Sequence, residues 1–204
     1  MTDRPKLPRH LIAAVAGTLA LAAVAVPAGV SFAGTEPDPV TAGPPPTTQA
    51  ANYSAGQPVP AGLEPPAGHT LHAVLKAKGV QVYECRSAAW TLLEPAAYLT
   101  GVTMHPVKKV TALHFRGPSW QSDRDGSLLE GDPASVVRAP SAHRDSIPQL
   151  RITAKTARGG GLFGAVTYIQ RLDTVGGVAS GACTGSATKS VPYRAVYRFF
   201  TAGS

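Results

Sequence analysis

The stretch Val191-Pro-Tyr-Arg-Ala-Val-Tyr-Arg-Phe-Phe200 indicates the fold most directly. Side chains of a β-strand alternate between two faces, and here every second residue is aromatic or small. One face therefore carries Tyr193, Ala195, Tyr197 and Phe199, and the other carries Arg194 and Arg198. The alternation predicts a strand with one apolar and one charged face.

Short segments of the same kind recur upstream of this stretch. Each is rich in β-branched or aromatic residues and is bounded by Gly, Pro or Asp, which is typical of strands. They are His69 to Lys76, Val80 to Cys85, Val110 to Phe115, Leu150 to Lys155 and Ala165 to Leu172. No long segment has the 3.6-residue period of a helix. The sequence therefore predicts an all-β domain, a single antiparallel β-sandwich or small β-barrel with at most short helical turns.

Two places in this pattern interrupt the strands. Lys78-Gly79 is predicted to form the turn between the first two segments. Pro95 divides Trp90 to Glu94 from Ala96 to Thr100, and proline fits a sheet only at an edge or a bend because it lacks an N–H. A short helix is the alternative for residues 90–100.

The N-terminus has the pattern of a secretory signal peptide. Arg4, Lys6 and Arg9 precede an apolar run from Leu11 to Val26, which is short of the roughly 20 residues that span a bilayer. Small residues at the end of this region predict cleavage after Ala33, with Ala28 as the alternative. We therefore expect residues 1–33 to be a signal peptide, and an uncleaved anchor is the competing interpretation.

Residues 34–67 are rich in Pro, Thr, Ala and Gly and offer little apolar surface to bury. Such composition predicts a disordered linker, followed by a β-rich globular domain over residues 68–204. The chain has a net charge of +7, part of which lies in the predicted signal peptide. The remaining basic residues are neither clustered nor interleaved with aromatic residues, so we expect no nucleic-acid partner.

The two cysteines, Cys85 and Cys183, both lie in the part predicted to be exported. An isolated pair in an oxidising compartment most simply forms one disulfide. A metal pair and a free reactive thiol are the alternatives, although neither cysteine has a neighbouring Cys or His at metal-ligand spacing.

Four motifs carry a resemblance to a known family. They are GVQVYEC at 79–85, HFRGPSW at 114–120 with DGS at 125–127, TYIQRLDTVGG at 167–177 followed by Cys183, and VPYRAVYRFF at 191–200. Together they resemble a family of exported bacterial and fungal proteins known only as a domain of unknown function. The resemblance implies one secreted β-rich domain and pairing of Cys85 with Cys183. It implies no activity, substrate or cofactor.

The densest group of chemically able side chains lies between His114 and Gly131. A nucleophilic mechanism would use Ser127 or Ser119, with His114 as base and Asp125 or Asp123 to orient it. However, no GxSxG motif surrounds either serine. Asp125-Gly126-Ser127 is also a typical turn sequence, so a structural role is the alternative.

Ligand binding and metal binding are the other hypotheses. Trp120, Asp125 and Arg171 are the candidate ligand contacts, with Trp120 as an apolar platform or, alternatively, a core residue. Arg171 is expected to contact a ligand or to pair with Asp125 or Asp173. A metal would need convergence of His69, His72, His105, His114 and His143, and residues three apart on a strand face opposite sides, so we predict no metal site.

These observations favour a secreted, disulfide-bonded β-domain that binds a ligand or associates with the cell envelope without catalysis. A small molecule or a cell-wall polysaccharide is the expected partner. We predict no cofactor and no stable membrane insertion once the signal peptide is removed, and the domain would be extracellular or bound to the cell wall. The alternative is a secreted hydrolase-like enzyme that uses the loop from His114 to Ser127.

Overall fold

The computed structural model describes residues 58–203. The described residues are almost entirely β-strand, which confirms the predicted fold class. The strands are β1 (His69–Arg86), β2 (Ala89–Thr103), β3 (Lys109–Phe115), β4 (Ser119–Ser122), β5 (Leu128–Gly131), β6 (Val137–Ala139), β7 (Gln149–Arg158), β8 (Val166–Gly176) and β9 (Thr188–Ala202). A single 3₁₀ turn, η1 (Pro133–Ser135), lies between β5 and β6 in the described part.

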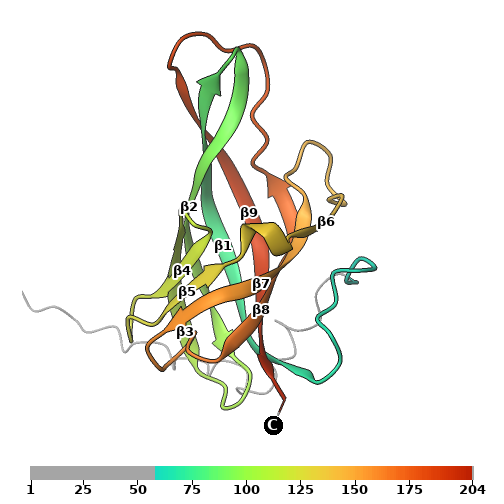
Figure 1. The fold of residues 1–204 in the computed structure, drawn as a ribbon, viewed down its shortest axis with the longest axis vertical. Coiled ribbons are helices and arrows are strands. Elements are labelled where there is room, and N and C mark those ends of the chain that lie inside the picture. The colour runs from blue at the N-terminus through green and yellow to red at the C-terminus, as the bar shows by residue number, and fades with distance from the viewer. Residues whose placement is uncertain (1–57, 204) are drawn as a thin grey trace, which may run out of the picture. The chain divides into compact units, whose positions relative to one another are not determined.

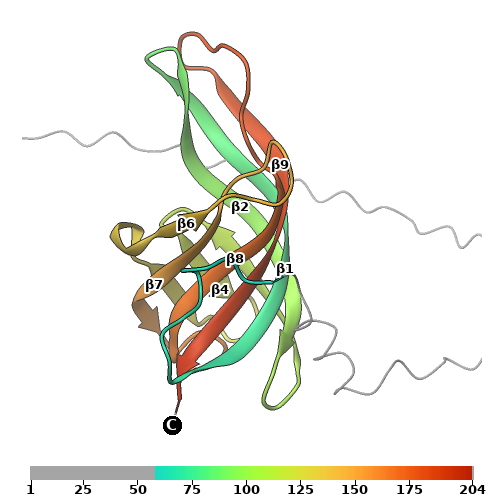
Figure 2. The same ribbon diagram turned by 90° about the vertical axis from the view of Figure 1, so that its right-hand side faces the viewer.

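The strands form one antiparallel sheet that closes on itself. Its order is β5-β4-β3-β2-β1-β9-β8-β7-β6, and a further pairing of β5 with β7 joins the two ends. Figures 1 and 2 show the strands wrapping around a common interior. This pairing gives β5 a second neighbour and closes the sheet, so the domain is a small β-barrel.

The seam of this barrel is interrupted on one side. β5 and β6 pair with successive parts of β7, since Gly131 lies opposite Ala154 and Val137 lies opposite Arg151. Between them η1 leads the chain away from the ladder, with Asp132 as its N-cap. β6 pairs only with β7 among the described residues, so the barrel is open beside η1 and β6.

Three strands extend beyond the closed part as an arm, formed by residues 80–86 of β1, 89–96 of β2 and 188–193 of β9 (Figure 1). The pairing of β2 with β3 begins only at Ala97. Pro95 therefore lies where β2 is an edge strand, and it continues the strand opposite Gln81. The predicted edge position of Pro95 is confirmed, and the alternative of a short helix is wrong.

The predicted turn at Lys78-Gly79 is also wrong, because β1 runs unbroken through both residues. Gly79 is needed for close approach of two strands. A Cβ atom built on it would lie 2.2 Å from the carbonyl oxygen of Ala96 and 2.5 Å from Ala97 Cα. Glycine here marks tight packing within a long strand.

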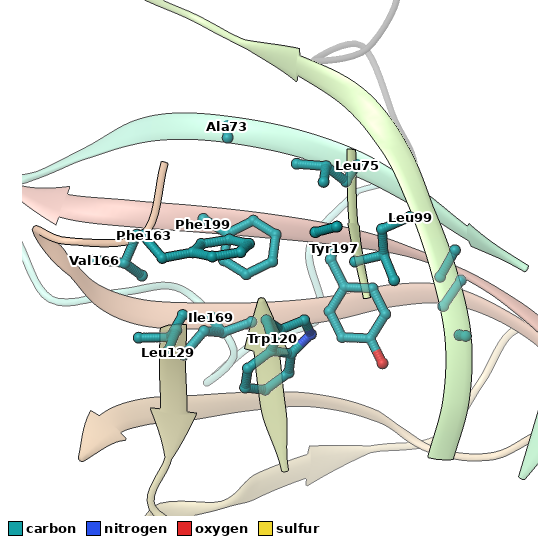
Figure 3. Packing of buried hydrophobic residues seen from close by; sticks show 14 of the residues in the cluster. Ala73, Leu75, Leu99, Trp120, Leu129, Phe163, Val166, Ile169, Tyr197 and Phe199 are labelled. Atoms are coloured by element: carbon teal, nitrogen blue, oxygen red, sulfur yellow. The ribbon is translucent and has the colours of Figure 1, made fainter. Parts of the chain in front are cut away.

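The core fills the closed part of the barrel. The alternation in β9 holds, because Tyr193, Ala195, Tyr197 and Phe199 are all buried. Phe163, carried by the β7–β8 loop, packs against Phe199 at a centroid distance of 5.0 Å. Figure 3 shows this aromatic cluster, with Trp120 and Tyr197 on the side away from Val166.

The start of the described chain lies against the barrel. Leu63 is fully buried, its carbonyl oxygen accepts a hydrogen bond from Gln170, and that of Glu64 accepts one from Arg151. Packing thus begins inside the segment 34–67 that composition predicts to be a linker, because one leucine is enough to anchor it. The predicted signal peptide and most of that linker lie outside the described residues. Within residues 58–203, no helix has the length and apolarity to cross a membrane.

A disulfide joins Cys85 near the tip of the arm to Cys183 in the β8–β9 loop, with a Cα–Cα distance of 5.7 Å. Next to it, the Cys85 N–H donates to the carbonyl oxygen of Ala187, which continues the ladder between β1 and β9. The covalent link therefore fastens the loop to the arm.

We expect replacement of both cysteines by serine to lower the free energy of unfolding, measured by urea denaturation. Closing a loop of 98 residues removes freedom from the unfolded chain worth at most about 4 to 5 kcal/mol. Mass spectrometry of the non-reduced protein should first show a peptide that links the two cysteines. Free thiols at both positions, or an unchanged unfolding midpoint after substitution, would contradict the prediction.

Candidate ligand-binding site

A cavity of about 430 Å³ lies at the open end of the barrel, at the base of the arm. Its walls come from β1, β2, the β3–β4 turn, η1 and β6, and the segment before and within β7. The apolar part of the lining includes Leu92, Leu93, Val136, Ile147, Leu150 and Ile152. Leu92 is 49% exposed, so solvent reaches the mouth of the cavity.

The floor is made of stacked rings that also belong to the core. Trp120 is 1% exposed, and its indole lies parallel to the His114 imidazole at a centroid distance of 4.6 Å. Both rings pack edge-on against Tyr197, at 5.2 Å from His114 and 5.8 Å from Trp120. Trp120 is therefore a core residue and part of the cavity lining at once.

Three fully buried side chains in the lining have polar atoms without a hydrogen-bond partner in the described structure. They are the Trp120 indole nitrogen, the Gln81 amide nitrogen and the Tyr197 hydroxyl. Arg171 and Tyr193 lie near that hydroxyl without reaching hydrogen-bond geometry. Burial raises the pKa of Tyr197, while the positive charge of Arg171 opposes the increase. An unpaired buried polar group costs about 1 to 3 kcal/mol, so these three atoms in the floor of the cavity lower the stability of the fold.

His114 is a neutral hydrogen-bond donor in this site. Burial lowers the pKa of His114 to about 3; the hydrogen bond to Ser119 acts against this, and the charge of Arg171 adds to it. The Nδ1–H donates to the carbonyl oxygen of Ser119 at 2.8 Å. Because a carbonyl oxygen only accepts, Nε2 is left as an acceptor.

Arg171 reaches the cavity from β8. Its Nε and Nη2 donate to the carbonyl oxygen of Pro148, at 3.3 and 2.9 Å. The predicted alternatives, pairing with Asp125 or Asp173, are not found among the described residues, where Asp173 pairs with His143 instead. Arg171 thus fixes Pro148 in the lining, and the remaining N–H groups of its guanidinium form no hydrogen bond with Asp125 or Asp173.

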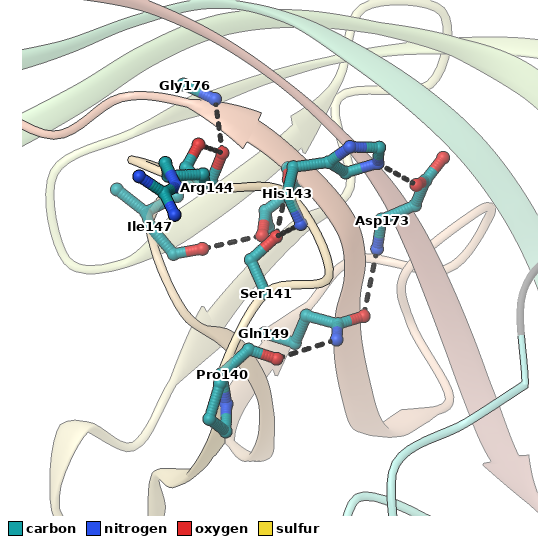
Figure 4. Close-up of polar contacts among 10 residues, drawn as sticks. Pro140, Ser141, His143, Arg144, Ile147, Gln149, Asp173 and Gly176 are labelled. Atoms are coloured by element: carbon teal, nitrogen blue, oxygen red, sulfur yellow. Dashed lines mark hydrogen bonds and ion pairs between the residues drawn. The ribbon is translucent and has the colours of Figure 1, made fainter.

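The loop over residues 140–148 places Ile147 and Pro148 on the cavity. Figure 4 shows hydrogen bonds between this loop and the C-terminal part of β8. The Ser141 hydroxyl donates to the Thr174 carbonyl oxygen, and the Gly176 N–H donates to the Ser146 hydroxyl. The fully buried Thr174 hydroxyl donates to the Ile147 carbonyl at 2.5 Å. These contacts fix one wall of the cavity.

Asp125 lies in a separate place, in the β4–β5 turn, and does not line the cavity. Its Oδ1 accepts from both the backbone N–H and the hydroxyl of Ser127, and its Oδ2 accepts from the Leu162 N–H. The Ser127 hydroxyl in turn accepts from the Phe163 N–H. Together these bonds hold the loop that inserts Phe163 into the core.

The candidate catalytic residues are therefore divided between two places. His114 bonds Ser119 through its backbone carbonyl, and no hydrogen bond joins its ring to either serine hydroxyl in the described structure. The Asp125 carboxylate is engaged by Ser127 and Leu162 and orients no histidine. Within residues 58–203, no three His, Cys, Asp or Glu side chains are grouped to hold a metal ion.

Sequence reasoning missed Gln81 and the proline- and leucine-rich walls of the cavity. Gln81 is 1% exposed, on the same face of β1 as Leu75 and Ala77. The sequence could have indicated Gln81, because it is a polar residue on a face of the strand that is otherwise apolar. The walls join segments far apart in the chain, and neither periodicity nor spacing reveals such a junction.

The family model described as Protein of unknown function (DUF3455) matches residues 66–201. The chain belongs to the DUF3455 family. Comparison with curated proteins and with solved structures found no match. The DUF3455 match covers all the strands except the last residue of β9, and it covers every residue of the cavity lining, so the cavity belongs to the family domain itself.

We expect Asp125→Ala to lower the free energy of unfolding by about 1 to 2 kcal/mol, because the hydrogen bonds to the carboxylate are lost. The expected loss is small because solvent reaches this turn and weakens the interactions of the charge. Burial alone would raise the pKa of Asp125, but hydrogen bonds from Ser127, Leu162 and Ser122 lower it. A carboxylate with a lowered pKa stabilises the fold above the usual Asp range, and the benefit disappears as pH falls through the folded-state pKa.

Urea denaturation of the wild type and Asp125→Ala at pH 7 and pH 3 tests this. The difference between their free energies of unfolding should be smaller at pH 3 than at pH 7. Asp123→Ala is the control, since the Asp123 carboxylate accepts only from the exposed side chains of Tyr98 and Thr111. An equal loss from both substitutions would contradict a special role for Asp125.

A second prediction concerns acid sensitivity. Because the pKa of His114 is about 3 in the fold and about 6.5 in an unfolded chain, the unfolded state binds one more proton between these values. Stability should therefore fall by up to about 1.4 kcal/mol per pH unit below pH 6.5. His114→Gln should flatten this slope in denaturation measured from pH 7 to pH 4.5, whereas His105→Gln, at an exposed position, should keep it. Identical slopes for wild type and His114→Gln would contradict the prediction.

Proposed function

We propose that this protein is an exported, non-enzymatic binding module that holds a small ligand with an apolar body in the cavity at the open end of the barrel. The observation that carries the proposal is the cavity itself. It has a volume of about 430 Å³, apolar walls, and three buried polar atoms without partners in the described structure. Ligand sites in proteins combine an apolar surface of this size with a few directed polar groups.

Export is supported by two independent features. The N-terminus has basic residues, an apolar run and small residues in the order of a signal peptide. The Cys85–Cys183 disulfide is compatible with an oxidising compartment outside the cytosol. A small molecule fits the walls better than a wall polysaccharide does, because leucine, isoleucine, valine and proline side chains offer few partners for sugar hydroxyls.

The test uses 1-aminoanthracene, an uncharged probe that becomes fluorescent in apolar sites, with the chain exported into an oxidising compartment. We expect saturable binding to the wild type. Val136→Trp should abolish it, because Val136 lines the cavity and an indole there fills the space. Val137→Trp is the matched control, since Val137 is 38% exposed and is not part of the lining.

Circular dichroism and melting curves would verify that both variants fold. Equal binding to wild type, Val136→Trp and Val137→Trp would place the probe outside the cavity and contradict the proposal. So would an absence of saturable binding. A soluble wall glycan that raises the melting temperature while 1-aminoanthracene does not bind would favour the polysaccharide instead.

A further inference from the structure

Arg171 occupies a position that the barrel otherwise gives to core residues. It lies directly opposite Leu150 on β7 and Tyr197 on β9. Residues paired across strands share a face of the sheet, and Tyr197 is fully buried. On β8, Arg171 also shares its face with Ile169, which is fully buried in the core. The guanidinium is thus directed to the interior side of the barrel, where it lines the cavity.

The charge of Arg171 is not compensated by any carboxylate in the described structure. Its side chain donates to a neutral acceptor, the carbonyl oxygen of Pro148. Glu94 is the one acidic residue among the described residues that line the cavity, and it pairs with Arg116 at 3.2 Å. A guanidinium has five N–H groups, so three of them are left after the two bonds to Pro148.

The neighbouring groups of the lining supply further donors. The indole N–H of Trp120 and the amide nitrogen of Gln81 can only donate, and the Tyr197 hydroxyl can do so as well. All three belong to side chains that are 1% exposed, and none has a partner within residues 58–203. The guanidinium is a cation beside an apolar wall, and the three donors are buried just behind the lining surface, so the cavity favours a ligand whose polar end is an acceptor with negative charge.

We propose that the cavity binds a small monocarboxylic acid, with the carboxylate on Arg171 and a short hydrocarbon body against the leucine and isoleucine side chains. This assignment rests on the proposed ligand-binding function. The planar fork of a guanidinium matches a carboxylate. One negative charge balances one unpaired cation, whereas a phosphate dianion would leave a second charge uncompensated beside an apolar wall. Arg138 also lines the cavity, but it is exposed on β6, where water screens it.

The experiment compares ligands with the same eight-carbon body and different polar ends. Octanoate, 1-octanol, octylamine and octyl phosphate are titrated into the wild type by calorimetry, and each is also tested for displacement of 1-aminoanthracene. We expect octanoate to bind at least about ten times more tightly than 1-octanol, since a charged hydrogen-bonded pair contributes about 1.5 to 3 kcal/mol and a factor of ten corresponds to 1.4 kcal/mol. Octylamine should not bind.

Arg171→Met removes the charge and keeps the apolar stem. It should lose the preference for octanoate over 1-octanol while still binding 1-aminoanthracene. Arg151→Met is the matched control, because Arg151 lies on the adjacent strand and also donates to a backbone carbonyl, that of Glu64, outside the cavity lining. This control should keep the wild-type preference.

Tyr197→Phe supplies a second variant if Arg171→Met does not fold. A merely structural hydroxyl without a partner should leave octanoate binding unchanged when it is removed. We expect instead that Tyr197→Phe binds octanoate about three to ten times more weakly, with a melting temperature equal to or above that of the wild type, because an unsatisfied buried group is lost.

The outcomes separate the two proposals. If 1-octanol and octanoate bind equally well to the wild type, the cavity binds ligands but the carboxylate assignment is overturned. Tighter binding of octyl phosphate than of octanoate would overturn it in favour of a phosphate ligand. If neither 1-aminoanthracene nor any eight-carbon compound binds, both proposals fail.

Discussion

The pairing of β5 with β7 is the constraint on which the rest of the structure depends. It joins β5 at one end of the sheet to β7 near the other end, so that the sheet encloses one interior. The enclosed space is then filled by residues from opposite ends of the chain, including Ala73, Trp120 and Phe199. The same pairing requires the β4–β5 turn and the β7–β8 loop to meet, and the hydrogen bonds that the Leu162 and Phe163 N–H groups donate to Asp125 and Ser127 hold them together. Closure and the local tie therefore support each other.

Closure ends where η1 diverts the chain, and the cavity lies beside that point. The wall that replaces the missing ladder is a loop whose Ser141 and Ser146 hydroxyls are hydrogen-bonded to the backbone of β8. The cavity walls are largely apolar, but the side chains of Gln81, Trp120 and Tyr197 in the lining have buried polar atoms without a partner in the described structure. Buried polar atoms in a protein core are usually hydrogen-bonded. The unpaired atoms cost stability, and rules of this kind are broken mostly at functional or strained sites.

Local patterning was enough to predict the fold class and most strands. The alternation in β9 correctly predicted which side chains are buried, and the isolated cysteine pair correctly predicted the disulfide. Glycine and proline were harder to interpret, because Gly79 relieves a contact between strands and Pro95 lies within one. Of the three residues predicted to contact a ligand, Trp120 and Arg171 line the cavity and Asp125 does not. Convergence of distant segments depends on sheet closure, which no single stretch of sequence encodes.

The arm has one further consequence, for how the protein behaves at high concentration. Over residues 89–96 the outer side of β2 has no neighbouring strand among the described residues, so its backbone is a template to which another molecule's strand could add. Pro95 interrupts this template, because it has no N–H to offer. Lys189, placed over the Trp90 ring at 5.6 Å, adds a positive charge near the tip. The proline and the charge oppose edge-to-edge pairing of the arm with a second molecule.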